Sequence, residues 1–322
     1  MRLKSFSIAL LAALCVSACM REDGNAAPRA DEAEQPAAAP PAGAPAAGGT
    51  MSLEQAQQAL PGFPVENLPP YLRQTLVQVA QDEFVYDGSP YTLAGCLKED
   101  KPCKRHAMRG LTVLANALAG GASATEALTA YGRYYNSFDQ KNRKSIELVD
   151  APCLGPADAK VTLVEYADYE CPHCAAAAPL LHQVAEQHPD VRLCFQHFPL
   201  PTHDNAFSAS QAAVYAQRQG KFWELHELIF KNQQRLSPQV IKDLVQQVGL
   251  DPQGLVQAVQ KDELAPVVEK QRDQGRKLGV MGTPTVFVNG RQYALPLSPE
   301  LLRFTIEDEL EWQSHGGKWA NE

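Results

Sequence analysis

Apolar and polar positions follow a helical pattern in the first half of the chain. After Pro70, apolar residues recur at three- or four-residue intervals, as at Leu72 and Leu76, and this spacing is typical of a helix that begins at the proline. A second, longer helix is predicted from about 102 to 119, and the Gly-Gly pair that follows is expected to end it. Residues 51–148 are therefore predicted to form a small all-helical domain.

A strand–helix–strand unit is predicted at the start of the second half. The apolar runs VTLVEYAD (161–168) and VRLCFQHF (191–198) are typical of buried strands, and a helix is predicted between them, from Pro172 to about 188. In a parallel unit of this kind, the amino end of the helix meets the carboxyl end of the first strand. Reactive side chains collect at this edge of a sheet, and Cys171 is expected to lie there.

The remaining segments complete an α/β domain. Four helical stretches are predicted between 202 and 278, and TPTVFVNGRQYAL then predicts two strands joined by a turn at Asn289-Gly290. A last helix is predicted to start at Ser298-Pro299. The order β-α-β, helices, β-β-α is the connectivity of the thioredoxin fold with a helical insertion before its third strand. Residues 150–315 are predicted to adopt this fold.

The amino terminus indicates export. A short positive region is followed by an apolar run, Phe6 to Val16, that is too short to span a bilayer. VSAC then resembles the lipobox of bacterial lipoproteins, which implies cleavage before Cys19 and attachment of lipid to it. Residues 1–18 are therefore predicted to be a signal peptide. An ordinary signal peptide that ends near Ala18 is the alternative, and both alternatives predict an oxidising compartment.

The segment behind Cys19 has the composition of a tether. Residues 19–50 are rich in Ala, Pro and Gly with scattered acidic residues, and such a segment cannot bury a core. We expect a protein of the periplasm that is anchored to the cell envelope by lipid. Met20 stands where aspartate marks retention at the inner membrane, so the outer membrane is favoured. At the other end of the chain, residues 316–322 are predicted to be a tail.

Cysteine usage agrees with an exported protein. The chain has eight cysteines, and six remain once cleavage removes Cys15 and lipid occupies Cys19. An even number of cysteines in an exported protein indicates disulfide pairs. The stretch CLKEDKPC, from Cys96 to Cys103, is predicted to be a loop closed by a disulfide. A second redox pair is the alternative, but this spacing gives the thiols no shared helix start that would activate one of them.

Cys153 and Cys194 are predicted to form a structural disulfide. Cys153 precedes the first core strand, and Cys194 lies inside the second. A bond between them would close a long loop and stabilise the fold by about 2–4 kcal/mol in the usual chain-entropy model. Two buried free thiols are the alternative.

The last two cysteines, Cys171 and Cys174, form a C-x-x-C motif. Haem attachment requires a histidine directly after the motif, where this chain has Ala175. A structural zinc site usually takes two such pairs, and the sequence has a single one. A purely structural disulfide would be a tight ring of the kind that is usually exposed and reactive. A redox-active disulfide is therefore the favoured interpretation, and it needs no other cofactor and no metal.

Redox chemistry at this motif has a physical basis. Cys171 is expected at or just before the first helical turn, where unpaired backbone N–H groups and the helix dipole favour its thiolate. Pro172 suits the first turn, and the ring of His173 can donate to the thiolate or lie near it as a cation. A stabilised thiolate favours the reduced form and makes the disulfide an oxidant. Cys174 is expected to be more buried and to be the resolving thiol.

Two distant features fit a redox centre. Glu165 precedes Cys171 on the incoming strand, where it could lie buried beneath the pair and shuttle the proton of Cys174; a strand-end acid facing water is the alternative. Thr283-Pro284 opens the third strand. A cis bond there would turn the Thr283 backbone toward the cysteines, and the exposed edge could pair with an extended substrate. A trans proline that starts the strand is the alternative.

Four motifs in this order resemble the DsbA-like thiol:disulfide oxidoreductases of the thioredoxin superfamily: VTLVEYADYECPHC, FQHFPLPTHDNAFSASQAA, GKFWELHELIF and GTPTVFVNG. The resemblance covers about 150–312. It implies a redox-active Cys171–Cys174 disulfide, a cis proline at Pro284 and a buried acid at Glu165. Pro-His between the cysteines is the dipeptide of the strongly oxidising branch. Thr283 differs from the valine of the best-known oxidases and is closer to the isomerases, which leaves the direction of electron flow open.

The sequence therefore predicts a lipid-tethered thiol:disulfide oxidoreductase that acts on cysteines of exported proteins, in the first place as an oxidase. A DsbB-like membrane protein is the expected redox partner. Nucleic acid is not an expected partner, because the net charge is -8 and basic clusters are lacking. Two alternatives stay open: a disulfide isomerase or reductase, and a tethered binding or chaperone module in which the cysteine pair is only structural.

Overall fold

The structure is a computed structural model, and it describes residues 51–98, 101–148 and 150–319. The predicted signal peptide, the lipid site at Cys19 and the predicted tether lie outside the described residues. Within the described ranges, no helix combines the length and apolar content that crossing a membrane requires. These ranges belong to one compact unit, 49–322. The predicted boundary between two domains lies inside this unit and stays a prediction.

The first half is helical, as predicted. Its helices are α1 (Leu53–Ala59), η1 (Val65–Asn67), α2 (Pro70–Asp82), α3 (Leu93–Leu97), α4 (Lys104–Ala119), α5 (Ala124–Asn136) and η2 (Gln140–Asn142). The start of α5 is a capping box, because the Ser123 hydroxyl accepts from the Glu126 N–H while the Glu126 carboxylate accepts from the Ser123 N–H. The Cys96–Cys103 disulfide joins α3 to the start of α4.

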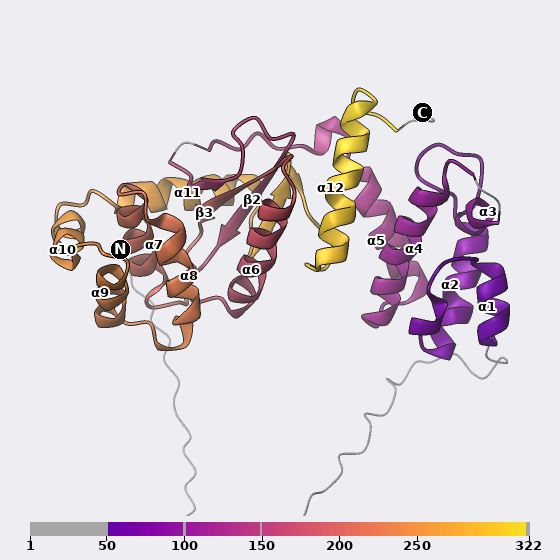
Figure 1. The fold of residues 1–322 in the computed structure, drawn as a ribbon, viewed down its shortest axis with the longest axis horizontal. Coiled ribbons are helices and arrows are strands. Elements are labelled where there is room, and N and C mark those ends of the chain that lie inside the picture. Colours follow the sequence, from indigo (N-terminus) through magenta and orange to yellow (C-terminus); the bar gives the residue numbers. More distant parts are fainter. Residues whose placement is uncertain (1–50, 99–100, 149, 320–322) are drawn as a thin grey trace, which may run out of the picture. The chain divides into compact units, whose positions relative to one another are not determined.

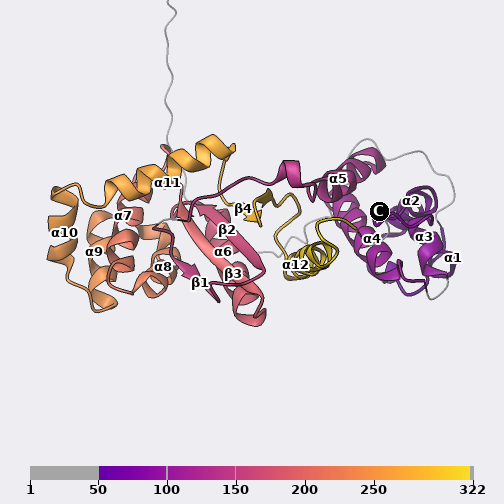
Figure 2. The ribbon, with the colours of Figure 1, turned by 90° about the horizontal axis from the view of Figure 1, so that it is seen from above.

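The second half contains a mixed five-stranded sheet, which confirms the α/β fold class. Its strands are β1 (Cys153–Leu154), β2 (Val161–Ala167), β3 (Val191–His197), β4 (Thr285–Val288) and β5 (Arg291–Gln292). The strand order is β1-β3-β2-β4-β5, with β2 and β3 parallel and the other pairs antiparallel. Figure 2 shows β1, β3, β2 and β4 side by side. Cys153 lies opposite Cys194 in the β1–β3 pair, and the two form a disulfide.

Alternation along β2 assigns its side chains to the two faces of the sheet. Leu163 packs in one cluster with Leu181 and Ile306, which belong to α6 (Pro172–Gln187) and α12 (Pro299–Ser314). Tyr166 lies in a different cluster, on the opposite face, with Phe287 of β4. Glu165 shares the phase of Leu163 and therefore faces α6, which Figure 1 shows alongside β2 and β3.

The helical insertion between β3 and β4 contains five α-helices rather than the four predicted. They are α7 (Ala206–Gln217), α8 (Phe222–Lys231), α9 (Pro238–Gln247), α10 (Pro252–Gln260) and α11 (Ala265–Leu278), with η3 (Gln233–Arg235) after α8. Apolar periodicity hardly breaks between α10 and α11, where Asp262 takes a left-handed conformation (φ 56°) that ends the helical path. Ser237 and Asp251 cap α9 and α10, since both side chains accept from first-turn N–H groups.

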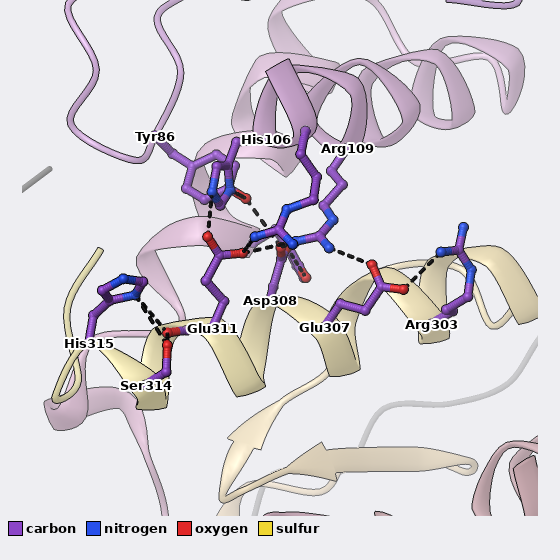
Figure 3. A network of polar contacts seen from close by, with 11 residues as sticks. Tyr86, His106, Arg109, Arg303, Glu307, Asp308, Glu311, Ser314 and His315 are labelled. Carbon is purple, nitrogen blue, oxygen red and sulfur yellow. Dashed lines mark hydrogen bonds and ion pairs between the residues drawn. The ribbon is translucent and has the colours of Figure 1, made fainter. Parts of the chain in front are cut away.

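Helix α12 contacts the amino-terminal helices as well as the sheet. Figure 3 shows Arg109 of α4 between carboxylates of α12, paired with Asp308 and Glu307. The side chains of Arg109 and Asp308 are 2% and 0% exposed. Nε2 of His106, on the same helix, lies 2.8 Å from Glu311 Oε1. Buried charges are tolerated when each meets an opposite charge. The buried charges of α4 and α12 therefore require the two helices to stay in contact.

A second ionic cluster joins the segment after α5 to the β4–β5 turn. Arg143 Nη1 lies 2.7 Å from Glu309 Oε1, and Arg291 Nε lies 2.9 Å from Glu309 Oε2. The Lys144 N–H donates to the Gly290 carbonyl at 2.7 Å. The predicted hairpin is confirmed, and the helical segment contacts its turn. Trp319, within the stretch predicted to be a tail, is buried in the aromatic cluster of the first half.

Candidate active site

The C-x-x-C motif lies at the start of α6, as the sequence predicts. Cys171 is the N-cap residue with an extended backbone, and Pro172 occupies the first helical position. The Cys171 carbonyl accepts from the N–H groups of Cys174 and Ala175 at 3.1 and 3.2 Å. Proline contributes no N–H at this end, and the N–H of His173 lies too early in the helix to meet an acceptor within it. Cys171 is 5% exposed and Cys174 is 0% exposed.

Both sulfurs are free thiols in this structure, which therefore represents the reduced pair. Sγ of Cys171 donates a hydrogen bond to the Thr283 carbonyl at 3.2 Å, across 112 residues of sequence. The Thr283–Pro284 peptide bond is cis, and β4 begins directly after it. The fold thus brings Cys171, Thr283 and Pro284 together at one edge of the sheet.

Glu165 is a buried acid beneath the motif. It occupies the middle of β2, between Phe195 of β3 and Val286 of β4. Its side chain is 1% exposed, and within the described residues its Oε1 has no hydrogen-bond partner. Burial raises the pKa of Glu165 to about 8. The alternative of an acid facing water is therefore wrong.

The resolving position has a different electrostatic environment from the helix start. Burial, and then the negative charge of Glu165, raise the pKa of the Cys174 thiol well above its ordinary value. Such a group is stable as the thiol and unstable as the thiolate, so its sulfur leaves a disulfide readily only if it receives a proton. Glu165 can supply one, because its own pKa of about 8 allows both protonation states near neutral pH.

Two hollows flank the motif. An apolar groove of about 390 Å³ includes exposed His173 and cis Pro284 in its lining. Its other lining residues are Ala176, Ala177, Leu180, Val286, Tyr293, Leu295 and Leu297. A polar pocket of about 330 Å³ lies against Glu170 and Pro172, with His203 and Gln233 in its wall. A polypeptide that reaches Cys171 would therefore find the apolar groove and the polar pocket next to the motif.

Sequence reasoning missed two residues that hold the turn before α6. The buried carboxylate of Asp168 accepts from the N–H groups of Glu170 and Leu200 at 2.7 and 2.6 Å. Its position directly after an apolar strand is a signal for such a turn. Gln233, from η3, donates its side-chain amide to the Cys171 carbonyl at 2.9 Å. No local sequence pattern predicts that contact, because 62 residues separate Gln233 from Cys171.

Curated relatives match the second half of the chain. The Na(+)/H(+) antiporter NhaA 3 of Salinispora tropica is 36% identical over 153 residues, which are 47% of this chain and 24% of the antiporter. The disulfide bond formation protein D of Bacillus subtilis is 28% identical over 171 residues, which are 50% of this chain and 77% of that protein. The chain thus spans about a quarter of the length of the antiporters it matches.

Solved structures of similar proteins include BdbD from Bacillus subtilis in its oxidised form, with 26% identity and a TM-score of 0.47. That match covers 52% of this chain and 97% of BdbD. The catalytic domain of ScsC from Proteus mirabilis has 23% identity and a TM-score of 0.46, and the match covers 56% of this chain and 97% of that domain.

A family model described as thioredoxin matches residues 147–308, about half of the chain. The matched range contains the whole of the sheet and the C-x-x-C motif, and it agrees with the range over which the motifs resemble the DsbA-like oxidoreductases. The resemblance inferred from the sequence is thereby confirmed. The chain belongs to the thioredoxin family.

Proposed function

We propose that this protein is a thiol:disulfide oxidoreductase that exchanges a Cys171–Cys174 disulfide with cysteines of exported proteins. The observation that carries the proposal is the position of Cys171, the N-cap of α6, with its Sγ 3.2 Å from the Thr283 carbonyl beside Pro284. Cys174 lies behind it, buried next to Glu165. The disulfide is the only redox group that this chemistry needs.

In the oxidising direction the cycle starts from the disulfide form. A thiolate of the client attacks Sγ of Cys171, the Cys171–Cys174 bond breaks, and the sulfur of Cys174 leaves and takes up a proton. A second client thiolate then attacks the client's sulfur in the mixed disulfide and releases Cys171 as a thiolate. Two client thiols have lost two electrons, and the cysteine pair has gained them.

Each residue of the site has a role in this cycle. The start of α6 stabilises the Cys171 thiolate that leaves in the last step. Glu165 supplies the proton to Cys174, which suits a carboxyl group with a pKa of about 8. The backbone of Thr283 and Pro284, with the apolar groove and the exposed ring of His173, offers an extended client a surface beside the reactive sulfur.

We infer that the direction of exchange is oxidation. A helix start that favours the Cys171 thiolate favours the reduced pair, so the disulfide is readily given away. The relative in Bacillus subtilis is named for disulfide bond formation. A DsbB-like membrane protein is the proposed acceptor of the two electrons. The proposed place is the periplasm, with the chain held at the envelope by lipid on Cys19, and the two structural disulfides agree with an oxidising compartment.

Exchange with a reduced, unfolded client protein tests the proposal. The oxidised protein should convert client thiols to disulfides stoichiometrically, and Cys171→Ser should abolish this. Cys174→Ser should instead accumulate a mixed disulfide with the client when supplied as a disulfide with a small thiol. A Cys96→Ser, Cys103→Ser double variant serves as the control and should keep the exchange. If Cys171→Ser and the unaltered protein oxidise the client equally, the proposal is wrong.

The redox state inside cells tests the direction. Acid quenching followed by alkylation of free thiols reports the fraction of Cys171–Cys174 that is oxidised. An oxidase should be found mostly as the disulfide, whereas an isomerase or reductase should be found mostly as the dithiol. A dithiol in growing cells would overturn the oxidase assignment and leave the exchange chemistry in place.

A further inference from the structure

The insertion helices contact the turn before α6 through several side chains, and that of Gln233 donates a hydrogen bond to Cys171 itself. Gln233 is the first residue of η3. Its Nε2 donates to the carbonyl of Tyr169 and to the carbonyl of Cys171, each at 2.9 Å. In the described part of the chain, the Tyr169 carbonyl has no other hydrogen-bond donor. One amide group therefore spans the turn that leads into α6.

The residues next to Gln233 fix its position by their packing and hydrogen bonds. The next helical residues end at Leu236, which is buried in the same apolar cluster as Phe230 of α8. The side chain of Asn232 donates to the Leu228 carbonyl at 2.7 Å and fixes the end of α8. The ring of Tyr169 packs on Phe230 at 4.9 Å between centroids. The turn before α6 and the segment that carries Gln233 thus pack on the same apolar cluster around Phe230.

The Cys171 carbonyl is the group on which this contact acts. It accepts from the N–H groups of Cys174 and Ala175, which are the first bonds of α6, and from Gln233 as well. An N-cap side chain interacts with the N–H groups of the second and third helical residues when its peptide plane is held in the capping orientation. A fixed carbonyl at Cys171 therefore keeps this residue at the N-cap of α6, with its Sγ 3.2 Å from the Thr283 carbonyl.

We propose that Gln233 is a positioning residue for Cys171. By holding the carbonyls of Tyr169 and Cys171, it keeps Cys171 at the N-cap of α6, where the helix dipole favours the thiolate without rearrangement of the turn. This inference rests on the proposed function, in which Cys171 leaves as a thiolate in the last step. It assigns to the helical insertion a part in the reactivity of the cysteine pair.

The test compares Gln233→Met with the unaltered, reduced protein. Methionine matches the length of glutamine but cannot donate to the two carbonyls. Iodoacetamide alkylation of Cys171 is followed by mass spectrometry at pH 6 and pH 9. We expect the variant to react about fivefold more slowly at pH 6, the equivalent of one net hydrogen bond, and at the normal rate at pH 9, where even an ordinary thiol is largely ionised. Gln234→Met, in the wall of the same pocket, is the control and should react normally at both pH values.

Two results would overturn the inference. One is equal alkylation of Gln233→Met and the unaltered protein at pH 6. The other is a slower reaction by the same factor at both pH values together with a lowered melting temperature, because that pattern means a purely structural role. Alkylation does not require a client, so these results are independent of the exchange assay. Loss of exchange dependence on Cys171 would instead disprove the proposed function.

Discussion

Glu165 and Cys174 are buried together in the space between β2 and the start of α6, with exposed fractions of 1% and 0%. Burial, and next the negative charge of Glu165, raise the pKa of the Cys174 thiol. Neither group gains a compensating positive charge in the described structure, since burial is the sole cause of the raised pKa of Glu165. Burial therefore favours the protonated, neutral form of both groups.

The first prediction concerns stability and pH. Burial raises the pKa of Glu165 from 4.5 to about 8. The stability that this group contributes is fully present below about pH 4.5 and is lost as pH rises through 8, because the unfolded chain gives up the proton more easily. Glu165→Gln removes this dependence. Between pH 5 and pH 8 the variant should gain roughly 3 kcal/mol relative to the unaltered protein, as measured by urea unfolding.

The control for that measurement is Glu186→Gln, the same change on α6 at a side chain that is 62% exposed. It should leave the difference between the two pH values unchanged within about 0.5 kcal/mol. A Glu165→Gln protein that loses stability between pH 5 and pH 8 as steeply as the unaltered protein would show that Glu165 does not titrate in this range.

The second prediction concerns the rate of exchange. Glutamine at position 165 removes the carboxyl group that supplies the proton to the leaving sulfur of Cys174. Glu165→Gln should therefore exchange with a reduced client at least about tenfold more slowly near pH 7. The rate of the unaltered protein should also change as pH passes the Glu165 pKa of about 8, whereas the profile of the variant should lack this step. Stopped-flow fluorescence with the oxidised protein measures both. An unchanged profile in Glu165→Gln would contradict the role of the carboxyl group.

The sequence predicts the active-site residues well where local chemistry decides the structure. Pro172 predicts that Cys171 stands at a helix start, and α6 begins at Pro172. The turn at Asn289-Gly290 follows from two residues that tolerate positive φ, and both have it, at 46° and 82°. In each case the conformation depends on neighbours in the sequence.

Contacts between distant segments could not be predicted in the same way. Asp308 and Glu309 stand in an amphipathic helix and look like solvent-facing acids, yet both are fully buried. Their burial depends on Arg109, Arg143 and Arg291, from three other segments. A single sequence carries no signal that pairs these residues, because each partner is set by the packing of α12. The contact of Gln233 with the active site was missed for the same reason.

The third prediction tests the ion pair of Figure 3. Arg109→Leu leaves Asp308 without the guanidinium that it contacts, at a position that is 0% exposed. An uncompensated buried charge costs about 3–5 kcal/mol, so the melting temperature and the urea midpoint should fall markedly. The double variant Arg109→Leu, Asp308→Leu should recover a large part of the loss, because it removes both charges.

Arg303→Ala is the matched control for this pair. It removes a guanidinium that also contacts Glu307, at 2.8 Å, from a side chain that is 48% exposed. Exposed ion pairs contribute about 0–1 kcal/mol, so this change should have little effect. If Arg109→Leu is as mild as Arg303→Ala, the buried pair does not hold α4 to α12.

The last prediction concerns the approach of the helical segment to the β4–β5 turn. Gly290 has φ 82°, and a Cβ there would lie 2.2 Å from the Lys144 carbonyl oxygen. Gly249 has the same φ of 82° with no heavy atom within 4 Å of such a Cβ. Gly249→Ala should cost only the strain of the left-handed backbone, about 1–2 kcal/mol. Gly290→Ala adds a clash with main chain that no side-chain rotation relieves, so urea unfolding should show a loss at least about 2 kcal/mol larger. Equal losses would mean that the segment around Lys144 moves away freely. The conformation of the β4–β5 turn would then not depend on its contact with that segment.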